Sequence, residues 1–110
     1  MAVRLSEILA QKSTVNVRFR GFTFDVEYKP NVVTPSFYES VFQDETSYRE
    51  QLETALSVIV TDWGLVDEEG NPLPITKEGM QDLSTPLLEK IYLSAVRDIR
   101  NTPTDEEKKI

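Results

Sequence analysis

Acidic side chains are the groups in this chain whose spacing comes nearest to a chemical motif. The run Asp67-Glu68-Glu69-Gly70 contains part of the pattern of a calcium-binding loop. That loop alternates oxygen ligands and needs a glycine at the sixth position and a glutamate at the twelfth. Counting back from Gly70 places Leu65 at the first position, so the ligand pattern fails. The run therefore predicts an exposed acidic turn and no metal site.

A second set of acidic residues invites comparison with the paired carboxylates of acid–base catalysis. Such catalysis requires two carboxylates held across a cleft. This set instead falls beside polar helix faces and helix starts, where acids are common. Histidine and cysteine are absent, which removes the commonest base near neutral pH, thiolate metal ligands and cysteine nucleophiles. These absences exclude most familiar hydrolase and zinc-site chemistries, so we expect no cofactor or metal, and an enzyme that uses carboxylates alone is the one enzymatic alternative left open. The set consists of Asp44, Glu45, Glu50, Glu53 and Asp62.

The charge of the chain limits its partners. The formal net charge is −7 and the isoelectric point is near 4.6. Such a surface repels nucleic acid, whose binding depends on cationic contacts to phosphate, and it repels anionic membranes in the same way. No apolar run approaches the ~20 residues that span a bilayer, and the N-terminus lacks the apolar core of a signal peptide. We predict a cytoplasmic protein with protein partners, and neither nucleic acid nor membrane among them.

Two alternating stretches near the N-terminus predict a β-hairpin. Apolar residues occupy odd positions from Val15 to Phe19 and even positions from Phe22 to Tyr28. This change of parity across Arg20-Gly21 is what a two-residue turn requires. An isolated hairpin is only marginally stable, so we expect helices to cover its apolar face. The predicted pairs are Phe19 with Phe22, Val17 with Phe24 and Val15 with Val26.

Capping residues and apolar stripes predict the helices. Thr34-Pro35 is typical of a helix start, because threonine caps free amides and proline suits the first turn. The most regular stripe belongs to a helix that a capping box opens at Ser47 and that we expect to run to Trp63. Further helices are predicted at residues 4–10, from residue 76 to residue 83, and from the Ser84-Thr85-Pro86 start to about residue 100.

These patterns predict an α+β, mainly helical fold in which an N-terminal β-hairpin packs on a small bundle of three to four helices. Residues 1–101 are expected to form a single domain, since domains commonly hold about 100–150 residues. Residues 102–110 are rich in charge and are predicted to be a flexible C-terminal tail.

Aromatic side chains are the remaining candidates for function. Trp63 has two interpretations, a core residue or an anchor for a partner, and we favour the core because Trp63 continues the apolar stripe of the long helix. Further aromatic residues cluster between the hairpin and that helix, either as internal packing or as an apolar surface for a partner. Among them we select Tyr38, Phe42 and Tyr48 as candidate partner-binding residues, with the acidic turn as a secondary surface.

The long helix and the segment after it resemble the tail assembly chaperones of long-tailed bacteriophages and prophages. The matching features are a helix that ends in Trp63, the stretch from Leu65 to Thr76, and the helix start at Leu83-Ser84-Thr85-Pro86. In the N-terminal half, the hairpin, Tyr28-Lys29-Pro30 and the Thr34-Pro35 helix start are also similar. The resemblance covers most of the chain apart from the first few residues and the tail. It consists of turns and caps, with no catalytic signature.

The resemblance implies a non-enzymatic assembly factor in the host cytoplasm. Such proteins bind the tape measure protein, keep it soluble and help recruit subunits of the major tail tube protein. They are usually absent from the mature virion, and self-association into a ring or spiral is compatible with the family. The alternative is a small structural tail component or head–tail joining component that remains in the virion.

Overall fold

The alternating N-terminal segment forms the predicted hairpin. The computed structural model describes residues 2–43 and 45–101, so the predicted tail at 102–110 and the acidic residue Asp44 lie outside the described residues. Strands β1 (Ser13–Phe19) and β2 (Phe22–Tyr28) are antiparallel. Arg20 and Gly21 have φ angles of 49° and 88°, as the two central residues of a type I′ turn require. The pairs Phe19–Phe22, Val17–Phe24 and Val15–Val26 are all confirmed.

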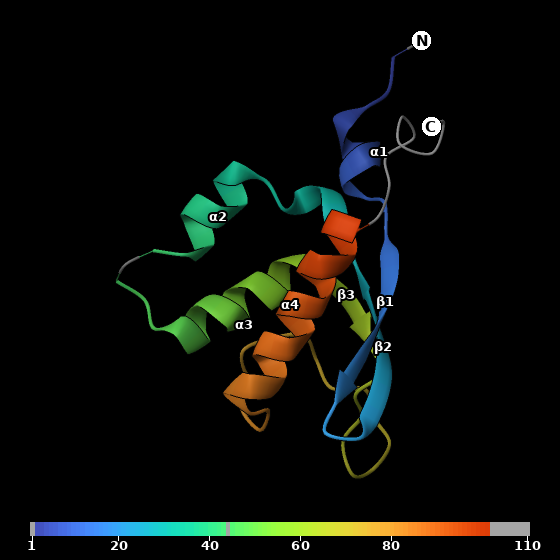
Figure 1. Cartoon of the computed structure of the whole chain (residues 1–110), viewed down its shortest axis with the longest axis vertical. Coiled ribbons are helices and arrows are strands. Elements are labelled where there is room, and N and C mark those ends of the chain that lie inside the picture. The colour runs from blue at the N-terminus through green and yellow to red at the C-terminus, as the bar shows by residue number, and fades with distance from the viewer. Residues whose placement is uncertain (1, 44, 102–110) are drawn as a thin grey trace.

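A third strand, absent from the prediction, completes the sheet. Helix α3 (Tyr48–Ile59) stops at Ile59 and runs directly into strand β3 (Val60–Trp63), which pairs antiparallel with β2. The prediction of one helix continuing to Trp63 was therefore wrong. The sequence Val58-Ile59-Val60-Thr61 explains the change, because β-branched residues lose side-chain freedom in helices and favour strands. The sheet order is β1-β2-β3 (Figure 1).

A bulge in β3 accounts for the misleading helical spacing. Tyr28 pairs with Val60 and Glu27 pairs with Asp62, so Thr61 is the extra residue at the register shift. Residues three apart in a regular strand point to opposite faces. The bulge instead brings both Val60 and Trp63 into the core, where each is at most 5% exposed. The three-residue spacing between Val60 and Trp63, which looks helical in the sequence, therefore arises in a bulged strand.

The other helices start as their capping residues predict. Helix α2 (Pro35–Val41) is capped by Thr34, whose Oγ1 accepts the Phe37 amide at 3.2 Å. Ser47 caps α3 by accepting the Glu50 amide at 3.2 Å. Ser84 accepts the Leu87 amide at 3.3 Å at the start of α4 (Thr85–Asn101). Short elements α1 (Leu5–Leu9) and η1 (Pro30–Val32) complete the described chain.

The segment that was predicted as a helix from residue 76 to residue 83 forms turns instead. Thr76 does cap this segment, since its Oγ1 accepts the Gly79 amide at 3.1 Å. The chain then doubles back so closely that a Cβ on Gly79 would lie 2.0 Å from the Pro74 carbonyl oxygen. The Met80 amide donates to the Thr76 carbonyl at 3.0 Å, but the following bonds span three residues, so the segment forms successive turns that place Met80 in the core.

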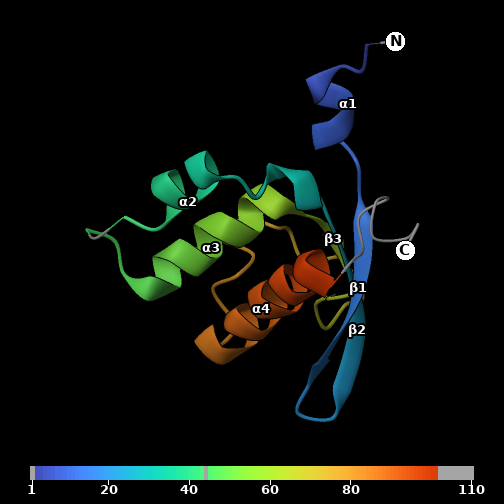
Figure 2. The ribbon, with the colours of Figure 1, turned by 45° about the horizontal axis from the view of Figure 1, so that its top comes forward.

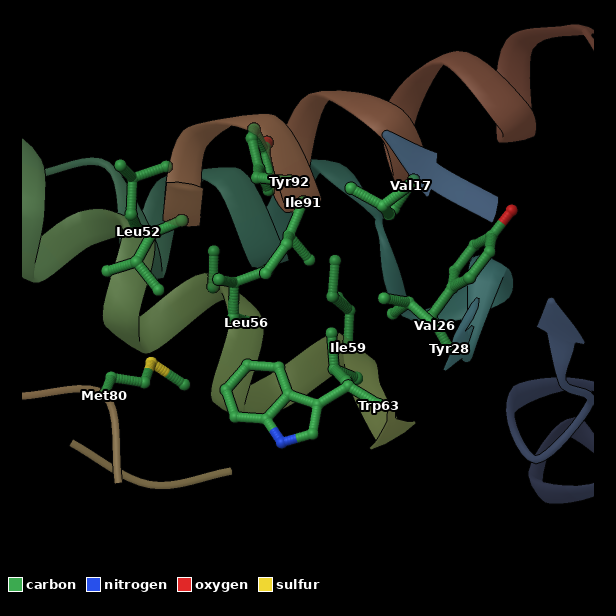
Figure 3. Packing of buried hydrophobic residues seen from close by; sticks show 14 of the residues in the cluster. Val17, Val26, Tyr28, Leu52, Leu56, Ile59, Trp63, Met80, Ile91 and Tyr92 are labelled. Carbon is green, nitrogen blue, oxygen red and sulfur yellow. The ribbon is translucent and has the colours of Figure 1, made fainter. Parts of the chain in front are cut away.

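The core lies between the sheet and the two longest helices. Figures 1 and 2 both show α3 and α4 on one side of the sheet, and no helix of the described residues covers the opposite side. Figure 3 shows Val17 and Val26 from the sheet facing Leu56 of α3 and Ile91 of α4, and all four are fully buried. The predicted α+β architecture with an N-terminal hairpin is thus confirmed. Its sheet has three strands where the sequence predicted two.

Candidate functional site

Two of the predicted partner-binding residues lie together on α2. Tyr38 and Phe42 are one helical turn apart, and their rings stack with centroids 5.9 Å apart. The Phe42 ring also lies 5.8 Å from the ring of Tyr92 on α4. Tyr92 is buried, Phe42 is half-buried and Tyr38 is 39% exposed. The stack therefore leads from the core out to the surface.

Tyr48, the third predicted partner-binding residue, comes from α3 and lies beside the same part of α4. Tyr48 is the first residue of α3 and is 49% exposed. Its hydroxyl donates a 2.7 Å hydrogen bond to the carboxylate of Glu89 on α4. Glu89 lies one helical turn before Tyr92 on the same side of α4. The structure thus brings Tyr38, Phe42 and Tyr48 together around Tyr92, although they come from different helices.

Tyr48 and Tyr92 keep their protons at neutral pH. The hydrogen bond to Glu89, followed by partial burial, raises the pKa of Tyr48 above its ordinary value of 10.0. Burial, followed by the nearby Tyr38, raises the pKa of Tyr92, and the cation of Arg100 opposes part of that shift. Neutral hydroxyls beside aromatic rings suit a binding surface that is apolar with a few hydrogen-bonding groups.

Leu93 is a further exposed apolar residue on the Glu89 side of α4, and it was missed in the sequence. It lies one turn beyond Glu89 on α4 and is 40% exposed. Its position outside the buried stripe of α4 was the available signal, because a large apolar residue on the polar side of a helix has no core to fill. We call Tyr38, Phe42, Tyr48, Tyr92 and Leu93 the aromatic surface.

The acidic turn is held together by its own first carboxylate. Asp67 Oδ1 accepts the amides of Glu69 and Asn71, each at 2.9 Å, and the Gly70 amide donates to the Asp67 carbonyl at 3.0 Å. Residues 67–70 are all exposed, as predicted for a turn. Within residues 2–43 and 45–101, no three acidic side chains converge in a way that could hold a metal ion.

The acidic residues considered for catalysis are dispersed. Glu45, Glu50 and Asp62 are exposed on separate segments, and Asp44 is outside the described residues. Glu53 instead forms an ion pair with Arg49, one turn earlier on α3, at 3.5 Å. These four described carboxylates therefore do not form the paired arrangement across a cleft that acid–base catalysis requires.

Trp63 belongs to the core, as favoured from the sequence. It is 4% exposed, and its indole Nε1 donates to the Leu73 carbonyl at 2.8 Å. Figure 3 shows its ring between Met80 and Ile59. The bond to Leu73 anchors the acidic turn segment to the sheet. Trp63 therefore stabilises the fold and is not part of an exposed contact surface.

A small apolar pocket lies at the turn end of the hairpin and was not predicted. Its volume is about 290 Å³. The helices cover the apolar face of the hairpin at Val17 and Val26 but not at this end, where Phe22 is 74% exposed. Figure 2 shows the turn end projecting past α3 and α4. We call this the hairpin pocket; it is lined by Phe19, Phe22, Thr23, Phe24, Gly64, Leu65 and Leu87.

The face of the sheet away from α3 and α4 carries a shallow polar hollow of about 470 Å³. Asp25, Glu27 and Asp62 line it, and Glu27 forms a 3.5 Å ion pair with Lys12. The hollow is open and polar, so it differs in character from the aromatic surface and from the hairpin pocket.

Comparisons with protein-family models, curated proteins and solved structures found no match for this chain. The resemblance to tail assembly chaperones therefore stays a prediction that depends on the residues quoted above. No helix in the part of the chain that the structure describes is both long and apolar enough to cross a membrane.

Proposed function

We propose that this protein is a non-enzymatic tail assembly chaperone of a bacteriophage or prophage, acting in the host cytoplasm. In this role it binds the tape measure protein and helps recruit the major tail tube protein, and it is absent from the mature virion. The observation that carries the proposal is the aromatic surface. Tyr38 and Tyr48 are well exposed there while a packed ring pair, Phe42 and Tyr92, supports them from below.

The aromatic surface suits a helical partner. It is formed by side chains of α2, α3 and α4, so a partner meets rings and aliphatic groups instead of a free strand edge. An amphipathic helix satisfies its own backbone hydrogen bonds and can place its apolar stripe on such a surface. Binding of this kind is reversible and needs no nucleotide hydrolysis.

The charge of the chain agrees with a solubilising role. A net charge of −7 favours solubility and so suits a factor that must keep an aggregation-prone partner in solution. The exposed acidic turn at residues 67–70 offers a secondary contact for basic segments of the partner. Self-association into a ring or spiral belongs to the same proposal.

Co-expression with the neighbouring tape measure protein tests the proposal. We expect the tape measure protein to stay soluble and to co-purify with this chain. The variant Tyr38→Ser/Tyr48→Ser should weaken co-purification about tenfold or more, because exposed aromatic anchors dominate such contacts. Val58→Ser is the matched control, since Val58 is exposed on α3 and is not part of the aromatic surface.

An insoluble, unbound tape measure protein would refute the chaperone function. Equal losses for Val58→Ser and the double tyrosine variant would refute the assignment of the aromatic surface. Mass spectrometry of purified particles distinguishes the chaperone from the alternative function, because a structural tail or head–tail joining component would be present in stoichiometric amounts.

A further inference from the structure

The hairpin pocket is a binding feature distinct from the aromatic surface. Its walls are phenylalanine side chains of the hairpin on one side and Leu65 and Leu87 on the other. A volume of about 290 Å³ lies at the small end of ligand pockets, which span roughly 300–1,000 Å³. It suits one or two apolar side chains of a protein partner better than a cofactor. Phe22 leaves most of its ring in water unless a partner covers it.

Arg20 gives the rim of this pocket a fixed positive charge. Its guanidinium lies 5.3 Å from the ring centroid of Phe19, which lines the pocket. Among the residues that the structure describes, no acidic side chain forms an ion pair with Arg20. Its φ of 49° is left-handed, where Asn, Asp or Gly is preferred and other residues cost about 1–2 kcal/mol. A strained arginine at this position points to a role outside the turn itself.

The apolar lining of the hairpin pocket favours a helix over an extended strand as the bound segment of the partner. The pocket is bounded by the side-chain face of the hairpin, so a strand inserted there could not pair with β1 or β2. Its apolar lining provides few hydrogen-bond partners for an extended backbone, and unsatisfied backbone groups are costly to bury. A helix brings its backbone bonds already formed.

We propose that the hairpin pocket binds one face of an amphipathic helix from a protein partner. An apolar side chain of that helix enters the pocket beside Phe22, and a carboxylate one turn away pairs with Arg20. The partner is therefore a helix that carries an apolar residue and, one helical turn away, an acidic residue. This site does not depend on the chaperone function, because it lies at the turn end of the hairpin and shares no residue with the aromatic surface.

A pair of synthetic peptides tests this site. The first is an alanine-rich helix with a leucine and, one turn away, a glutamate; the second has lysine in place of the glutamate. In amide NMR spectra of the labelled protein, the glutamate peptide should shift the signals of Phe22, Thr23, Gly64 and Leu65. Phe22→Ser should weaken binding about tenfold, and Phe22 is exposed enough for this variant to keep the fold, which the thermal midpoint checks.

A charge reversal provides the sharper control. Arg20→Glu should reverse the preference, so that the lysine peptide binds more tightly than the glutamate peptide. Arg18→Glu makes the same change of charge on the face of β1 opposite to Phe19, away from the pocket, and should leave the affinity within about twofold. No signal shift at peptide concentrations up to about 1 mM would overturn the proposal. Equal binding of both peptides, shifts confined to the aromatic surface, or equal effects of the two charge reversals would overturn it as well.

Discussion

The hydroxyl of Tyr48 donates a 2.7 Å hydrogen bond to the carboxylate of Glu89. This bond connects the first residue of α3 to the first half of α4, while the interior of both helices packs on the sheet. It also holds the Tyr48 ring at the edge of the aromatic surface. In the proposed function, this bond would preorganise Tyr48 and so reduce the entropy lost when a partner binds.

A double-mutant cycle measures the strength of this bond. We expect Tyr48→Phe and Glu89→Gln to couple by about 0.5–1 kcal/mol in urea unfolding. The value is small because the bond is exposed and water competes for both groups. Additive single effects, with no coupling, would mean that the bond does not persist in solution.

Alkaline pH should destabilise the protein. Burial, then the hydrogen bond and charge of Asp98, raises the pKa of Tyr28 above its ordinary value of 10.0, and the pKa of Tyr92 and Tyr48 is raised as well. The unfolded chain releases these protons first, so the free energy of unfolding is undiminished below pH 10.0 and falls as the pH rises above it. Urea unfolding over a pH series checks this decline, and Tyr28→Phe should reduce its slope. Complete titration of the folded protein near 10.0, followed by tyrosinate absorbance, would contradict it.

Arg49 connects three parts of the helical layer, and its removal should be costly. It donates to the Met80 carbonyl at 2.8 Å and to Thr85 Oγ1 at 3.0 Å, and it pairs with Glu53. Arg49→Met should lower the free energy of unfolding by about 1–2 kcal/mol, because these partners lose a charged donor. Arg97→Met is the control, since Arg97 is exposed on α4, and its effect should stay within about 0.5 kcal/mol. Equal effects would show that the Arg49 contacts add nothing.

Substitution by alanine should lower the free energy of unfolding by different amounts at two glycines. Gly79→Ala places a Cβ 2.0 Å from the Pro74 carbonyl oxygen and must displace backbone, so we expect a loss of about 2–3 kcal/mol. Gly70 has a φ of 86°, but a Cβ added there would meet no atom within 4 Å, so Gly70→Ala should cost only about 1 kcal/mol. Thermal unfolding of both variants gives the comparison. The reverse order would mean that the turns at residues 76–83 are not packed on Pro74.

The sequence predicted those elements whose formation depends on residues close together in the chain, namely the hairpin and the helix starts. The alternation around Arg20-Gly21 predicted the hairpin and its register, and Thr34 and Ser47 cap the helices that they were expected to start. The candidate residues Tyr38, Phe42 and Tyr48 could also be selected, because aromatic residues outside the main stripes are visible in the sequence.

Features that depend on distant contacts were not predictable in the same way. Strand β3 exists because Val60 and Trp63 pair with β2, and its bulge imitates helical spacing. The hairpin pocket lies where the turn end of the hairpin projects past α3 and α4, a matter of helix placement that no local pattern encodes. The cluster around Tyr92 likewise depends on the contact between Phe42, at the end of α2, and Tyr92 of α4.

The direct junction between Ile59 and Val60 has a mechanical consequence. The segment that begins at Tyr48 on the aromatic surface ends at Trp63, next to Gly64 in the wall of the hairpin pocket. No loop interrupts it to absorb a displacement. A force that tilts α3 must therefore move β3 or strain its pairing with β2 at the bulge. The segment therefore joins the proposed aromatic surface to the proposed hairpin pocket without an intervening loop.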